Sequence, residues 1–116
     1  MISREQAVLD EVTRIGGVRS ALLVSSDDGL VVVESALEDQ ATEAAAAFAA
    51  RLGGRLATLT SALRAPPMSV LLLQATAGQL FVVVGGPGLL LVAVTSNEVN
   101  IGEVRLALLA AAGQLN

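Results

Sequence analysis

The sequence predicts an α/β protein of the α+β kind, with a five-stranded antiparallel sheet between layers of helices. Three apolar runs of strand length follow one another between Arg64 and Glu98, a span without charge, and short glycine-containing turns separate them. Because these runs are apolar at nearly every position, both faces of the strands need cover. Three helical stretches can supply it, in the order αββαβββα. At 116 residues the chain forms one domain, residues 1–116.

The first helix is expected to begin after Ser3 and to end at Gly16-Gly17. Ser3 is a typical N-cap, with Gln6 at the capping-box position three residues later. Gly16 is expected to take the left-handed conformation that ends many helices. Apolar residues recur at helical spacing, and most charged residues lie opposite, which predicts an amphipathic covering helix.

Two strands are predicted next, Arg19–Ser26 and Leu30–Ser35. The link between them is Asp27-Asp28-Gly29, and Asp-Gly between apolar runs is a strong hairpin signal because glycine accepts the positive φ of the turn. The two aspartates could instead suggest a metal site. Without further ligands nearby in the sequence, we interpret them as turn residues.

A long central helix is predicted over Glu38–Leu63, with two apolar stripes of different size. The stripe of large residues, expected to cover the sheet, is Phe48, Leu52, Leu56, Leu59 and Leu63. The stripe of small residues, expected to contact the same helix of a second copy, is Ala46, Ala50, Gly53 and Ala57. The outward arc includes Arg51, Arg55 and Thr58. An alanine-rich surface helix, or a break at Gly53-Gly54, are the alternatives.

The remaining strands are predicted at Met68–Ala75, Gln79–Val84 and Leu89–Thr95, as antiparallel neighbours joined by hairpins. The sequence Gly85-Gly86-Pro87-Gly88 resembles a nucleotide-binding loop only superficially, because it leads into a strand instead of opening a helix. A final helix is predicted to start at the N-cap Asn100. Its predicted buried stripe is Val104, Leu108, Ala111 and Leu115.

Composition excludes several classes of function. The net charge of −4 and the two phenylalanines as sole aromatic residues argue against nucleic-acid binding. The chain has no cysteine, histidine or lysine, so most nucleophiles, general bases and transition-metal ligands are missing. We therefore expect no enzymatic activity, no cofactor and no metal. The turns break the uncharged span into runs too short for a membrane helix, and a cytoplasmic location is expected.

The chain resembles the roadblock / dynein light-chain family over essentially its whole length. The resemblance lies in the element order and in four stretches of sequence. These are Gly17-Val18, Ser26-Asp27-Asp28-Gly29-Leu30-Val31, the alanine-rich Ala44–Leu56, and Asn100-Ile101-Gly102-Glu103-Val104-Arg105-Leu106.

The resemblance implies a homodimer in which the central helices lie side by side. The third strands, here with Val70 and Leu72, would pair across the dimer into a ten-stranded sheet. It also implies a non-catalytic platform for a small Ras-like GTPase, and we expect Arg51, Arg55 and Thr58 to form the contact surface. The alternatives are a small-molecule sensor of profilin-like architecture and a purely structural dimerisation subunit.

Overall fold

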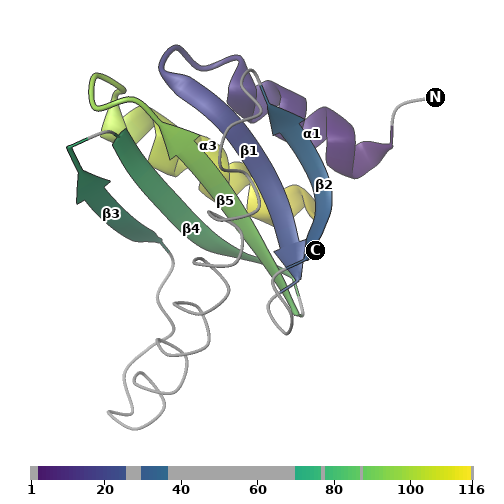
Figure 1. Cartoon of the computed structure of the whole chain (residues 1–116). Coiled ribbons are helices and arrows are strands. Elements are labelled where there is room, and N and C mark those ends of the chain that lie inside the picture. Colours follow the sequence, from purple (N-terminus) through teal and green to yellow (C-terminus); the bar gives the residue numbers. More distant parts are fainter. Residues whose placement is uncertain (1–2, 26–29, 37–69, 77, 87, 116) are drawn as a thin grey trace, which may run out of the picture.

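The computed structural model of the protein describes residues 3–25, 30–36, 70–76, 78–86 and 88–115. In these ranges the chain forms a five-stranded antiparallel sheet of order β2-β1-β5-β4-β3, with α1 and α3 on one face (Figure 1). The elements are α1 Arg4–Thr13, β1 Val18–Ser25, β2 Val31–Ala36, β3 Leu71–Ala75, β4 Gly78–Gly86, β5 Leu89–Thr95 and α3 Ile101–Leu115. The predicted fold class is confirmed, whereas the central helix predicted over Glu38–Leu63 lies outside the described residues.

The start of α1 follows the predicted capping pattern only in part. The Ser3 hydroxyl accepts a hydrogen bond from the Gln6 backbone N–H at 3.1 Å, as an N-cap should. The Gln6 side chain does not complete a capping box, because its Nε2 donates instead to Asp10 Oδ1 at 3.1 Å and to the Glu34 carbonyl at 2.9 Å. Gln6 thus connects α1 to strand β2.

The predicted end of α1 was wrong. The helix stops at Thr13, and the next residues form tight turns in which the Ile15 N–H donates to the Val12 carbonyl at 3.2 Å. The left-handed residue is Gly17, with φ of 95°, and not Gly16. A Cβ at Gly17 would lie 3.1 Å from both Ser96 Oγ and the Val99 side chain, so glycine is needed for close approach as well as for φ.

Strand pairing agrees with the predicted hairpins and adds a long-range pair. β1 pairs with β2 and also with β5, which joins the two hairpin regions into one sheet. β5 has its predicted bounds, whereas β4 extends beyond Gln79–Val84 because Gly78 pairs with Ala75 and Gly86 pairs with Leu89. β3 begins at Leu71, three residues later than predicted.

Each face of the sheet carries its own apolar cluster, and neighbouring residues alternate between them. On β1, Leu23 belongs to the cluster that packs against α1 and α3, whereas Leu22 belongs to the cluster on the opposite face. Both side chains are essentially inaccessible to solvent. The two terminal helices therefore share one face of the sheet.

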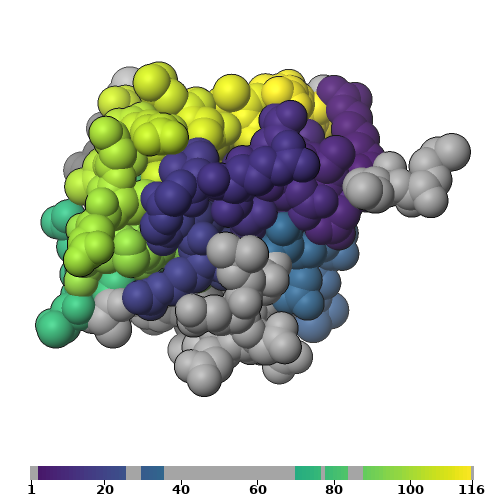
Figure 2. Space-filling model, turned by 90° about the horizontal axis from the view of Figure 1, so that it is seen from above, coloured from purple at the N-terminus to yellow at the C-terminus, as the bar shows by residue number. Residues whose placement is uncertain are grey.

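Helix α3 is capped as the sequence indicates, since Asn100 Oδ1 accepts a hydrogen bond from the Glu103 N–H at 2.9 Å. Val104, Leu108 and Ala111 are buried as predicted, and Leu115 is half-buried. Figure 2 shows the end of α3 directly beside α1. Neither of the described helices is long and apolar enough to cross a membrane.

Candidate interaction surfaces

The first candidate surface is the β3 edge, at one end of the strand order (Figure 1). β3 pairs with β4 without interruption, from Leu71 opposite Val82 to Ala75 opposite Gly78. The strand, LLLQA, contains no charge, proline or bulge, which are the usual means of protecting an exposed edge. This edge is therefore chemically suited to pair with another strand.

The side chains of the β3 edge are attached to the protein's own core. Val70 and Leu72, predicted at a dimer interface, are half-buried and pack against the cluster under α1 and α3. Leu71 packs against the opposite cluster, while Gln74 and Ala75 are exposed. Any pairing through β3 would thus use its backbone, with the half-buried leucines adding apolar area.

The other edge, β2, is built differently. Its pairing with β1 passes from Val33 to Val31, so Val32 forms a bulge, and the Val32 side chain is 56% exposed. Glu34 places a charged residue on the strand, and its backbone carbonyl accepts the hydrogen bond from Gln6. The bulge at Val32, the charge of Glu34 and the hydrogen bond from Gln6 together protect this edge from pairing with another strand.

A small polar network secures α1 over β2. The Thr13 and Ser35 hydroxyls lie 3.1 Å apart, and Thr13 Oγ1 also donates to the Asp10 carbonyl at 2.9 Å. Hydrogen bonds from Ser35 and then Gln6 lower the pKa of the Asp10 carboxyl, with a smaller contribution from nearby Arg14, against a desolvation effect that raises it. Asp10 is therefore held as an anion between the helix and the edge strand.

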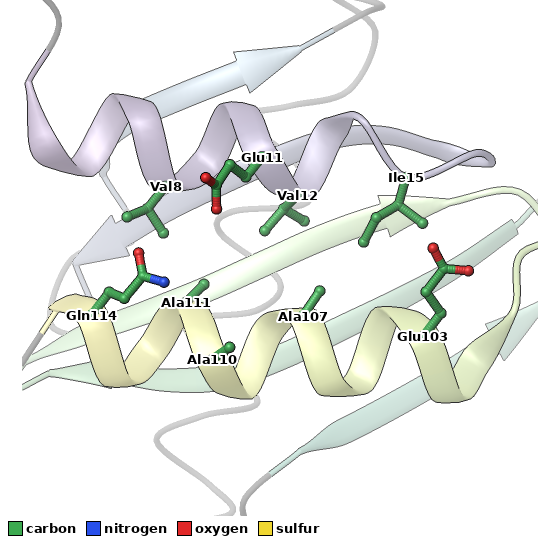
Figure 3. A pocket seen from close by; sticks show the side chains of 9 residues that line it. All are labelled: Val8, Glu11, Val12, Ile15, Glu103, Ala107, Ala110, Ala111 and Gln114. Atoms are coloured by element: carbon green, nitrogen blue, oxygen red, sulfur yellow. The ribbon is translucent and has the colours of Figure 1, made fainter.

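The second candidate surface is a groove of about 270 Å³ between α1 and α3 (Figure 3). Apolar side chains face each other across it, and two carboxylates and one amide complete its lining. The lining residues are Val8, Glu11, Val12, Ile15, Glu103, Ala107, Ala110, Ala111 and Gln114. Sequence analysis found the apolar stripe of each helix separately, and the signal that it missed was the run of alanines on α3.

Most of the predicted interface residues lie outside the described part of the chain. These are Ala46, Ala50, Gly53 and Ala57 of the small stripe and Arg51, Arg55 and Thr58 of the outward arc. The predicted turn residues Asp27 and Asp28 also lie outside it. Within the described ranges, no group of three or more acidic side chains is placed to hold a metal ion.

Comparison with known proteins decides the family. Residues 4–95 match the model of the Roadblock/LC7 domain. The chain belongs to this family. No curated protein sequence gives a significant match. The expected resemblance to roadblock / dynein light-chain proteins is thereby confirmed.

Solved structures show the same Roadblock/LC7 fold. Myxococcus xanthus MglB is 19% identical, with 98% of this chain and 93% of that one covered and a TM-score of 0.86. The gliding protein MglB of Thermus thermophilus is 23% identical, with 99% and 90% covered and a TM-score of 0.84. A Roadblock/LC7 domain of Streptomyces avermitilis is 25% identical, with 97% and 99% covered and a TM-score of 0.70.

Proposed function

We propose that this Roadblock/LC7 chain is a homodimeric platform in the cytoplasm that binds and regulates a small Ras-like GTPase, without chemistry of its own. Membership in the family supports the link to a GTPase. The lack of cysteine, histidine and lysine supports a role in binding and not in catalysis.

The observation that carries the homodimer is the unprotected β3 edge. An uncharged, regular edge strand is a template for pairing with another chain, and among the described residues β3 lacks the bulge and the charge that β2 carries. In the proposed dimer, two copies of β3 pair around a two-fold axis, and the small residues Ala46, Ala50, Gly53 and Ala57 meet their counterparts. The sheet then continues from one protomer into the next.

We place the GTPase on the outward arc of the paired central helices, at Arg51, Arg55 and Thr58. Arginine suits such a contact because its planar guanidinium forms paired hydrogen bonds with carboxylates.

The proposal is tested with the purified chain and a small Ras-like GTPase encoded beside it. We expect complex formation by size-exclusion chromatography with light scattering, and a change in the rate of GTP hydrolysis. The double variant Arg51→Glu/Arg55→Glu should abolish the complex but leave the dimer intact. A complex that survives this charge reversal would remove the proposed contact surface.

The dimer is tested separately through Ala50→Arg, which should yield monomers because a large charged side chain cannot enter a close helix contact. Ala110→Arg, at an exposed position of α3, is the matched control and should leave the dimer unchanged. If Ala50→Arg remains dimeric, the small stripe is not the interface.

A further inference from the structure

The groove between α1 and α3 has a floor and walls of small and branched aliphatic residues. Val8, Val12 and Ala111 are at most 5% exposed and form its base. Ala107 and Ile15 are half-buried at its sides, as Figure 3 shows for the opposing helices. Because alanine projects only a methyl group, the backbone of a third helix could approach α3 closely here.

The charges that line this groove have one sign. Glu11 on α1 and Glu103 on α3 are both exposed carboxylates, and no basic residue is among the described side chains that line it. In Figure 3 Glu103 lies across the groove from Ile15, whereas Glu11 lies between Val8 and Val12 on α1. The two carboxylates therefore come from opposite walls of the groove and lie at different positions along it.

The size of the groove favours side chains of a protein over a small ligand. Its volume, about 270 Å³, falls just below the roughly 300–1,000 Å³ of typical ligand pockets. Its polar groups lie along a groove between two helices and do not converge on one point (Figure 3). A helix laid in such a groove would use apolar anchors at i, i+3 and i+4.

We propose that this groove binds a helix of a partner protein that carries a small or aliphatic stripe and two basic residues beside it. The apolar stripe contacts Ile15, Ala107 and Ala110, which are at least partly exposed, and the basic pair meets Glu11 and Glu103. The acidic lining disfavours nucleic acid and membranes rich in anionic lipid. The proposal does not depend on the GTPase, since it concerns the face of the sheet that carries α1 and α3.

The test uses two synthetic alanine-based helical peptides with one central leucine. One has arginines at positions i and i+4, and the other has glutamines there. Methyl NMR of the full chain reports binding at Ala107, Ala110 and Ala111. We expect the arginine peptide to shift these methyl signals, and the glutamine peptide to bind more weakly.

Variants of the protein separate charge from shape. Glu11→Gln/Glu103→Gln should weaken the binding of the arginine peptide about three- to thirtyfold at low salt, given the strength of two exposed ion pairs. Glu34→Gln is the matched control and should leave the affinity for the peptide unchanged. Glu34 lies opposite Leu22 in the pairing of β1 with β2, and Leu22 belongs to the cluster on the face away from α1 and α3. Ala110→Trp should block the groove and abolish binding without loss of thermal stability.

Three results would overturn the proposal. The first is equal binding of the two peptides, or no methyl shift with either at millimolar concentration. The second is a loss of affinity in Glu34→Gln as large as that in the double variant. The third is a concentration-dependent shift of the groove methyls without any peptide, which would assign this surface to contact between copies of the chain.

Discussion

Strands β2 and β3 lie at opposite edges of one sheet, and they differ in charge and in the regularity of their pairing. β2 carries a bulge at Val32, a charge at Glu34 and a hydrogen bond from Gln6 to its backbone. β3 is uncharged and pairs with β4 without a shift in register. Within the described residues, β2 carries features that protect an edge from other chains, whereas β3 carries neither a bulge nor a charge.

The largest effect is expected from a charge placed on the open edge. Leu73→Lys should convert the proposed dimer into monomers, because Leu73 is half-buried on β3 and the change is repeated on both sides of a two-fold axis. The loss of roughly 2–4 kcal/mol of dimerisation free energy would raise the dimer dissociation constant about 30- to 1,000-fold. Light scattering across a dilution series measures this.

The matched control for that variant is Val32→Lys on the other edge, where the side chain already points into solvent at the bulge. It should leave the molecular mass in solution unchanged. If both variants dissociate the protein equally, or neither does, the two edges do not differ in the way described.

A second variant disturbs the strand on which the open edge depends. A Cβ at Gly78 would lie 2.5 Å from the Thr95 carbonyl oxygen, so Gly78→Ala must push β4 away from β5 near the turn into β3. We expect a loss of about 1–3 kcal/mol in the free energy of unfolding, as in other overpacked sites. Urea denaturation measures it. Gly16→Ala, with no atom within 4 Å of the added methyl, is the control and should not destabilise the fold.

A third variant opens the protected edge. Gln6→Ala removes the hydrogen bond to the Glu34 carbonyl and should lower the free energy of unfolding by about 0.5–1.5 kcal/mol. Hydrogen exchange should rise along β2 and stay constant along β3. Faster exchange spread evenly over the sheet would contradict a local role for Gln6.

The smallest effect concerns pH. The Asp10 pKa is lower in the folded chain than in the unfolded one, so this group stabilises the fold above its unfolded pKa, and that contribution disappears as the pH falls through the folded value. Asp10→Asn should therefore be less stable than the natural chain at neutral pH, with the difference shrinking below about pH 4. A constant difference across the whole range from neutral to strongly acidic pH would contradict this assignment.

The local signals in the sequence predicted most of the fold. Ser3 and Asn100 mark helix starts because their side chains bond nearby N–H groups, and the bounds of β5 follow from its apolar run. The prediction chose the wrong glycine of Gly16-Gly17, because the local sequence allows either one to be left-handed. What decides between them is contact with Val99, which lies far away in the sequence.

Long-range features were not predictable in this way. The pairing of β1 with β5 joins segments from opposite ends of the chain, and no local pattern encodes it. The groove combines Glu11 and Glu103 in the same way, from two helices that are remote in sequence. The pairing edge at β3 was implied by the resemblance to roadblock / dynein light-chain proteins. The sequence itself shows only that the stretch from Ser69 to Ala75 is uncharged.

The alternation of Leu22 and Leu23 between two apolar clusters has a consequence for how the sheet assembles. When both faces of a strand are apolar, a slip of one residue exchanges one leucine for another and carries little penalty. Something else must therefore mark the correct alignment. Three register shifts can fix it. They lie at Val32 in the pairing of β1 with β2, at Arg19 in the pairing of β1 with β5, and at Gly85 in the pairing of β4 with β5. Deleting any one of these residues should favour folding intermediates in which strands pair in the wrong register and convert slowly to the native fold.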